Sequence, residues 1–308
     1  MPTHPRSNNR TNVRPFIGRE LLQLGDAMAP GLVGAWAATR FFSPTRRRRP
    51  AWESALLASA RRGVVRAPEG ALPTWTWGAG PAVLLVHGWE GRGSQLASVV
   101  DALVGEGRSV VAFDAPGHGD APGRTTSVVD LARALTLVAT QTPELEAIVA
   151  HSLGAAATMV ALARAELAPK AVFVAPPLAA APWADGFAAR LGLPERVARA
   201  FRRGLVERLG VPVETIDARV LRPLGAVELL VVHDAADREV PLELGREVAA
   251  AWGGRLVETR GLGHRRILRS ARLAEELACF LVGRTPRAPQ AELEAELFQR
   301  DRRWRELH

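Results

Sequence analysis

The stretch AIVAHSLGAA, residues 147–156, passes from a short apolar run through His151 and Ser152 into a series of small residues. A continuous apolar run of this length predicts a buried strand, and the small residues predict a helix packed closely behind it. Ser152 then has two interpretations. It is either a nucleophile on a strand-to-helix turn or an N-cap that satisfies the free amides of the helix.

Other apolar runs, rich in β-branched residues, surround this stretch. They cover residues 82–88, 109–115, 171–177, 227–234 and 255–259. Such continuous runs are typical of a parallel sheet covered on both faces, whereas residues 74–78 alternate like an edge strand. Helical patterns lie between the runs at residues 94–107, 126–140, 153–166, 243–252 and 270–283. This alternation predicts an α/β fold with a mainly parallel, doubly wound sheet.

Three segments depart from the alternation and define the expected organisation. Residues 178–223 are helical in pattern and too long for one crossover, which predicts a short helical lid inserted into an α/β domain of residues 67–283. Residues 1–66 form a basic extension that we expect to be partly helical. Residues 284–308 begin with a proline-punctuated linker and predict a charged tail helix.

Composition limits the class of protein and its compartment. The chain has 308 residues, of which 47% are hydrophobic and 23% charged, as in globular proteins that are soluble. Cys279 is the only cysteine, which excludes an intramolecular disulfide and a cysteine-based zinc site and fits a reducing compartment. No secretory signal is convincing. We therefore expect a cytoplasmic location.

Positive charge is concentrated in the extension. Residues 1–66 carry twelve Arg against three acids, although the net charge of the whole chain is only +8. Lys170 is the only lysine, and alanine is abundant, so we interpret the basicity as coding bias and expect no nucleic-acid partner. Within residues 21–49, an apolar helix broken at Pro30 precedes four consecutive arginines. We favour packing of this helix on the domain, with peripheral membrane contact as the second interpretation.

Polar residues follow the predicted strands. They are the segment from His87 to Gly91, Asp114, the pair His151 and Ser152, Asp234 with Asp237, and His264. Because the carboxyl ends of parallel strands open at one edge, these side chains are expected to gather there. A serine nucleophile needs a base, and the base needs a carboxylate. The order Ser, Asp, His is the one expected of α/β-hydrolases.

From about residue 74 to 283 the chain resembles the α/β-hydrolase superfamily, in particular its bacterial esterase-like members with a short helical lid. The motifs appear in family order as VHGWEG, DAPGHG, AHSLG, and HDAADREVP followed by GLGH. Ala150 replaces the first glycine of the usual nucleophile motif, and Asp120 and Ala121 replace the residues usual after the second motif. Serine rather than aspartate at position 152 argues against dehalogenase or epoxide-hydrolase chemistry.

The positions of the histidines in the chain indicate the base, and the resemblance indicates the acid. We expect His264, 27 residues beyond Asp237, to have the freedom to reach Ser152. The resemblance favours Asp237 as the acid because Val-Pro follows it in the expected pattern; Asp234 is expected to hold the loop, and Glu239 is an outside candidate. The remaining internal histidines are expected to anchor loops. They are His87, His118, His151 and His233.

The resemblance also implies an oxyanion hole made by the backbone amides of Trp89 and Leu153. The Trp89 indole is expected either to wall the acyl pocket or to be buried packing. Glu90 and Arg265 are candidates for substrate contact, although for Arg265, as for Arg92 and Arg266, simple solvation is favoured.

The expected function is therefore a serine hydrolase that acts on a small acyl ester or thioester through an acyl-enzyme, with neither metal nor organic cofactor. Amide or peptide hydrolysis on the same residues is the first alternative. A non-catalytic protein of the membrane surface is the second, because superfamily membership does not by itself establish catalysis.

Overall fold

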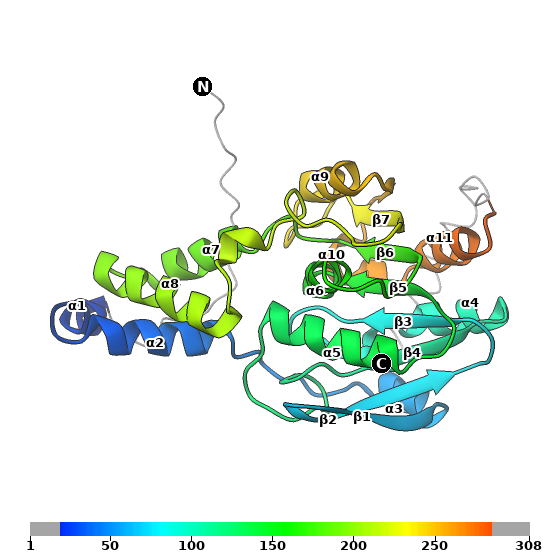
Figure 1. Ribbon diagram of the computed structural model, residues 1–308, viewed down its shortest axis with the longest axis horizontal. Helices are drawn as coiled ribbons and strands as arrows, with labels where there is room; N and C mark the ends of the chain where they lie inside the picture. Colours follow the sequence, from blue (N-terminus) through cyan, green and yellow to red (C-terminus); the bar gives the residue numbers. More distant parts are fainter. Residues whose placement is uncertain (1–18, 285–308) are drawn as a thin grey trace.

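The computed structural model describes residues 19–284, which build an eight-stranded sheet in the order β1-β2-β4-β3-β5-β6-β7-β8 (Figure 1). The strands are β1 (Arg61–Ala67), β2 (Gly70–Trp77), β3 (Ala82–Val86), β4 (Ser109–Phe113), β5 (Leu145–His151), β6 (Lys170–Val174), β7 (Glu228–Asp234) and β8 (Arg255–Thr259). The strands from β4 to β8 along this order are parallel, whereas β1 and β2 are antiparallel to their neighbours. The predicted α/β fold with a mainly parallel sheet is confirmed.

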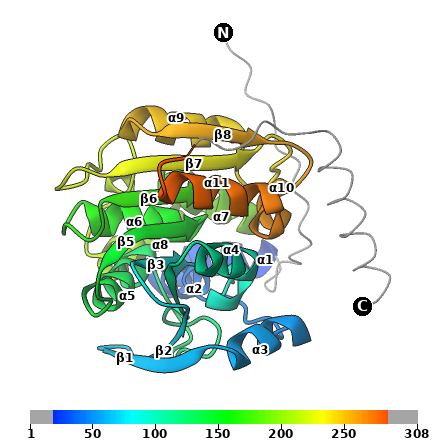
Figure 2. The same cartoon turned by 90° about the vertical axis from the view of Figure 1, so that its right-hand side faces the viewer.

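Helices cover both faces of the sheet (Figure 2). Successive side chains of a strand point to opposite faces, so Leu84 and Val86 of β3 enter one core and Val83 and Leu85 the other. The first core is closed by α5 (Val128–Thr140), α6 (Leu153–Leu162) and α9 (Leu242–Trp252). The second is closed by α3 (Ala51–Ala58), α4 (Ala97–Gly105) and α11 (Ala271–Leu281). Burial on both faces explains the continuous apolar runs of the central strands.

The amino-terminal edge of the sheet differs from the prediction. The division placed between residues 66 and 67 cuts through β1, which pairs along its whole length with β2. Residues 74–78 are therefore not an edge strand, because β1 covers β2 on its outer side. Periodicity missed β1 because its sequence is rich in arginine and only Val65 in it is buried.

Four helices stand apart from the sheet and form what we call the cap (Figure 1). Two come from the predicted insertion, α7 (Ala181–Leu191) and α8 (Glu195–Leu209), and two from the extension, α1 (Arg19–Met28) and α2 (Pro30–Phe41). Residues 178–223, predicted to form a lid, thus supply only two of the four helices of the cap. The break at Pro30 falls between α1 and α2, as predicted.

Small residues allow α2 and α8 to cross closely. A methyl group on Gly34 of α2 would lie 2.7 Å from the backbone nitrogen of Phe201, and one on Gly204 would lie 2.9 Å from Ala38 Cβ. The carboxylate of Asp26 in α1 also accepts a hydrogen bond from the Val197 amide at the start of α8. These contacts join the extension to the insertion.

The predicted tail of residues 284–308 lies outside the described residues except for Arg284. Within the part of the chain that is described, no helix is long and apolar enough to cross a bilayer.

Candidate active site

Ser152 lies on a sharp turn between β5 and α6. Its backbone has φ 52° and ψ −121°, a strained conformation for a residue with a side chain, and its hydroxyl does not cap α6. The turn is tight because Gly154 packs on β3, where an added methyl group would lie 2.6 Å from the His87 carbonyl oxygen. Ala150, fully buried one residue before His151, fits between β3 and β6. The N-cap interpretation of Ser152 is therefore wrong.

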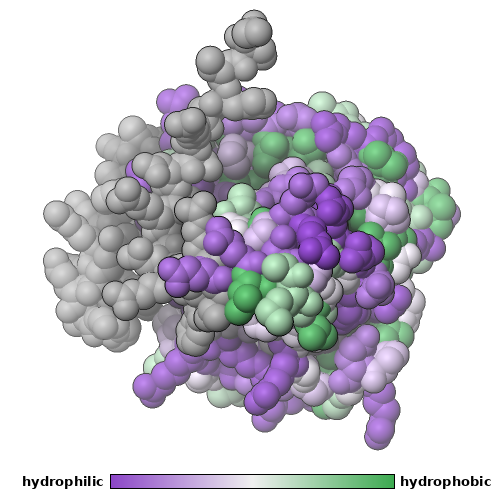
Figure 3. Space-filling view, turned by 90° about the vertical axis from the view of Figure 1, so that its left-hand side faces the viewer, coloured by the Kyte–Doolittle hydropathy of each residue, from purple (hydrophilic) through white to green (hydrophobic). Residues whose placement is uncertain are grey.

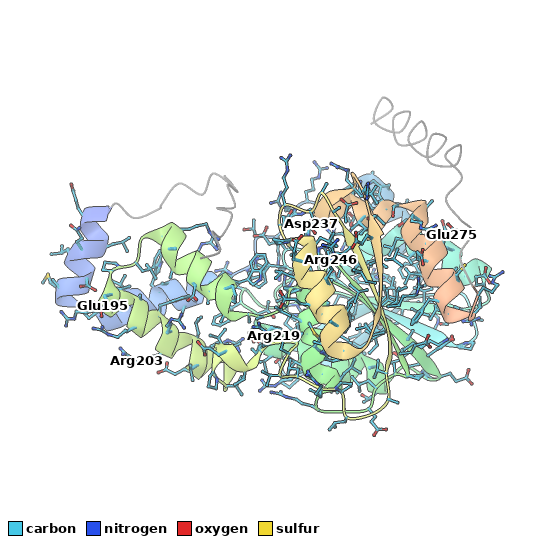
Figure 4. The ribbon with its side chains drawn as sticks, turned by 90° about the horizontal axis from the view of Figure 1, so that it is seen from above. Glu195, Arg203, Arg219, Asp237, Arg246 and Glu275 are labelled. Carbon is cyan, nitrogen blue, oxygen red and sulfur yellow. The ribbon has the colours of Figure 1, made fainter. Side chains whose placement is uncertain are left out.

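The structure brings Ser152, His264 and Asp237 together at the carboxyl ends of the strands. The distance from Ser152 Oγ to His264 Nε2 is 3.0 Å, and that from His264 Nδ1 to Asp237 Oδ2 is 2.7 Å. Asp237 lies at the edge of the α/β domain that faces the cap (Figure 4). With Nδ1–H directed at a carboxylate, Nε2 is the atom that can accept a proton from the serine.

The carboxylate of Asp237 is held in its charged form. Burial alone would raise its pKa, but hydrogen bonding by the His233 and His264 rings and by the Val240 amide holds the pKa well below its usual range. Asp237 Oδ1 accepts hydrogen bonds from the amides of Glu239 and Val240 at 2.8 and 2.9 Å, which leaves Oδ2 for His264. The charged carboxylate beside Nδ1 holds the His264 ring with Nε2 toward Ser152.

Asp234 ties the acid loop to the histidine loop. Its Oδ1 accepts from the amides of Ala236 and Gly263, and its Oδ2 accepts from Thr259 Oγ1 and the Leu262 amide, at distances from 2.8 to 3.0 Å. The predicted role of Asp234 in holding its loop is confirmed and extends further. His264 is correspondingly not on a free loop, as expected, but in the short helix α10 (Gly263–Arg266).

The other internal histidines bind backbone atoms, as predicted. His151 Nε2 lies 3.0 Å from the His264 carbonyl oxygen, and His233 Nε2 lies 2.9 Å from that of Val240. His87 and His118 each accept an amide through Nε2, from Ala115 and Glu90. Burial lowers the pKa of His87 to about 4 and of His118 to about 3, and holds that of His151 well below its usual value. His87, His118 and His151 are therefore neutral loop anchors, and His233 holds its loop through the Val240 carbonyl.

The loop after β3 lies against the nucleophile. A methyl group on Gly88 would lie 3.0 Å from Ser152 Cβ, which places the following residue, Trp89, beside the serine. Among the described residues, neither the Trp89 nor the Leu153 amide has an acceptor. Trp89 is half-buried, lines the cavity together with Ser152, and packs edge-on against His118, with ring centroids 5.5 Å apart. Its role as a wall of the acyl pocket stays a prediction.

The charged candidates around the site are already engaged. Glu90 accepts the Thr45 amide at 3.1 Å and pairs with Arg47, and Arg265 pairs with Glu239, although Glu90 and Arg265 both line the cavity. Glu239 therefore forms an ion pair with Arg265 and does not contact His264 as an acid would.

The expectation that the Arg92 side chain is solvated is wrong, because this side chain is buried. It binds both oxygens of Glu53 in α3, at 2.5 and 2.8 Å. Ser94 Oγ donates a hydrogen bond to the same carboxylate at 2.5 Å. No periodic signal marks Glu53, which lies 39 positions before Arg92 in the chain.

A cavity of about 480 Å³ lies between the cap and the α/β domain, with Ser152 and His264 in its wall. Its apolar lining comes from α2, α7 and α8 of the cap, from α6 and from the loops beside them, and includes Phe41, Phe42, Met159, Trp183, Phe187 and Leu209. Sequence patterns missed the contribution of Phe41 and Phe42 because nothing in the extension shows where it folds back. Within residues 19–284, no three His, Cys, Asp or Glu side chains form a metal site.

Most of the α/β domain matches a known protein family. Residues 83–276 match the model of the alpha/beta hydrolase family, and the chain belongs to that family. No curated protein sequence matches it.

Solved structures share the fold at low sequence identity. An esterase from Pyrococcus furiosus is 18% identical, with a TM-score of 0.58 over 78% of this chain and 98% of its own. An esterase from Exiguobacterium antarcticum is 17% identical, with a TM-score of 0.57 over 72% of this chain and all of its own. A bromoperoxidase from Bacillus anthracis, 18% identical, reaches a TM-score of 0.54 over 72% of this chain and all of its own. Because these proteins are named for different activities and are each under 25% identical to this chain, the likeness concerns the fold.

Proposed function

We propose that this α/β-hydrolase is a serine hydrolase that cleaves a carboxylic ester or thioester through an acyl-enzyme intermediate. The observation that carries the proposal is the chain of contacts from Ser152 Oγ through His264 to Asp237, built on a strained turn beside an apolar cavity. Strain at one residue costs free energy, and it is commonly retained where a functional group must be presented.

The chemistry follows from the contacts. As Ser152 Oγ attacks the carbonyl carbon, its proton passes to His264 Nε2, and the Asp237 carboxylate stabilises the resulting imidazolium. In this mechanism the Trp89 and Leu153 amides donate to the oxyanion. His264 then returns the proton to the leaving alcohol or thiol, and water attacks the acyl-enzyme with His264 again as base. Asp237 stays ionised throughout.

The contacts of Glu90 favour esters over peptides with a free amino terminus. An aminopeptidase needs a carboxylate for the substrate ammonium group, and Glu90 was the candidate for that role. Its oxygens are instead occupied by the Thr45 amide and Arg47. Peptide hydrolysis is thus disfavoured, because no free carboxylate is offered by Glu90 to the substrate ammonium group. The non-catalytic alternative is disfavoured because it does not explain the strained backbone at Ser152.

A fluorophosphonate probe tests the proposal, because it labels only a serine activated by a base. We expect the wild type and Ser43→Ala to be labelled and Ser152→Ala not to be. Ser43 is a suitable control because it lines the same cavity. An unlabelled wild type beside a labelled reference esterase would contradict the mechanism. Faster turnover of aminoacyl-naphthylamides than of acyl esters would contradict the substrate class.

A further inference from the structure

The cap exposes an unusual amount of apolar surface. Leu24, Met28, Leu32 and Trp36 are exposed by 55, 76, 76 and 37%, respectively. Together with Trp183 and Val206, the cap helices hold six of the nine exposed large apolar side chains in residues 19–284. Scattered apolar side chains are ordinary on protein surfaces, whereas a gathering of them marks an interaction site. Figure 3, which faces the cap end of the molecule, shows an apolar area bordered by hydrophilic side chains.

Helix α2 has two different sides. The side toward α8 is made of small residues, with Gly34, Ala37 and Ala38 buried. Leu32 and Trp36, four residues apart, share the opposite side and remain exposed. On α1, Leu24 and Met28 have the same spacing and are also exposed. The packing of α2 on α8 thus uses the small residues of α2 and leaves Leu32 and Trp36 exposed.

The cap is also basic. Its four helices contain eight arginines and five carboxylates. Three of the carboxylates are engaged within the cap: Asp26 by the Val197 amide, Asp185 by Arg202 and Glu195 by Arg199. By contrast, Arg196 and Arg203 on α8 have no acidic partner among the described residues. Arg203 lies on the outer side of α8 (Figure 4).

The arginine run, residues 46–49, contributes less positive surface than its sequence suggested. Arg46 donates hydrogen bonds to the carbonyl groups of Gly117, Ala121 and Gly123, and Arg49 pairs with Asp120. Those two guanidinium groups fasten the chain to the α/β domain. The free cations beside the apolar face therefore come largely from α8 rather than from this run.

We propose that the apolar face formed by α1 and α2, with the cations of α8 beside it, docks on an anionic lipid surface. Apolar side chains gain by entering the boundary between headgroups and acyl chains, and arginines gain from anionic headgroups. A second copy of the chain fits less well, because it would bring its own excess of arginines against this one. The docking does not depend on the proposed hydrolysis, so either can fail alone.

Co-sedimentation of the full chain with lipid vesicles tests the docking. We expect strong pelleting with vesicles that contain phosphatidylglycerol and phosphatidylcholine in equal amounts, and weak pelleting with phosphatidylcholine alone. Leu32→Ser with Trp36→Ser should lower the affinity by about tenfold, since two apolar groups leave the interface. Arg196→Gln with Arg203→Gln should lower affinity for the anionic vesicles by about fivefold per arginine and leave binding to phosphatidylcholine unchanged.

The matched control is Val64→Ser with Leu224→Ser, two side chains outside the cap that are each 63% exposed and should leave pelleting unchanged. Thermal melting of every variant separates lost binding from lost folding. Wild type that stays in the supernatant, or equal pelleting of wild type and the Leu32, Trp36 variant, overturns the proposal. A wild-type dimer that this variant alone dissociates assigns the face to a second copy and overturns it as well.

Discussion

The α/β domain and the cap position their residues by different physical means. Around Ser152 the reactive groups are held by hydrogen bonds to backbone atoms, as when Asp234 joins two loops through four bonds. The cap is held by close helix packing at Gly34 and Gly204 and by ion pairs at the surface. Hydrogen bonds are directional, whereas apolar packing of helices is not. We therefore expect the α/β domain to be the rigid part and to carry the proposed chemistry, and the cap to be the adaptable part that shapes the cavity.

The largest effect should come from the charge at the centre of the rigid part. In Asp237→Asn an amide nitrogen can face His264 Nδ1, so the ring adopts the tautomer that cannot accept the serine proton. We expect kcat on a short acyl ester to fall about 10⁴-fold with KM little changed. Asp120→Asn, an exposed carboxylate in a neighbouring loop, is the control. A loss below tenfold for Asp237→Asn would mean that another group orients His264.

A smaller loss of activity is expected from a change at Asp234, which does not contact Ser152 or the His264 ring itself. Asp234→Asn keeps its acceptor for Ala236 and Gly263 but places an amide nitrogen against the Leu262 amide, so the histidine loop shifts. Small misplacement of a catalytic group is costly, and we expect kcat to fall about 10²-fold with KM unchanged. Steady-state kinetics on the same ester measure this. A rise in KM at constant kcat would show instead that Asp234 shapes the cavity.

Acid should weaken the rigid part through its buried imidazoles. The pKa of His87 is lowered to about 4 from 6.5, so between these values the unfolded state binds more protons and stability falls as pH falls. From pH 7 to pH 5 this one ring costs about 2 kcal/mol of unfolding free energy. Urea unfolding at the two pH values should show that His87→Gln removes about that much of the wild-type loss. An equal loss in both proteins would contradict a neutral His87.

The smallest effect should come from the cap. Gly34→Val pushes against the backbone of α8 and should displace α2, which carries Phe41 and Phe42 to the cavity wall. We expect about a tenfold fall in kcat/KM for long-chain esters and little change for acetyl esters, which need only the surroundings of Ser152. Ala35→Val, on the exposed side of the same helix, should change neither. Equal losses for long and short esters would place the damage in the rigid part instead.

The same division explains what could be predicted from the sequence. Strands buried on both faces have a local signature, and short motifs mark the turns that carry Ser152, Asp237 and His264. The pairing of α2 with α8 has no such signature, because it joins segments whose patterns are each merely helical. Nor does the pairing of Glu53 with Arg92, since either residue alone is typical of solvent. The fold and the grouping of these three residues were thus accessible from the sequence, but the shape of the cavity was not.

The bond between Asp26 and Val197 spans 171 positions of the chain, and it bears on how the molecule is made. Contacts of such long range close late in folding, because the loop between them must first be ordered. During synthesis α1 and α2 emerge long before α8, and the central strands β3 to β6 can associate in the meantime. We expect the cap to be the last part to assemble and the first to open. The motion that completes folding would then be the reverse of the one that admits a ligand to the cavity.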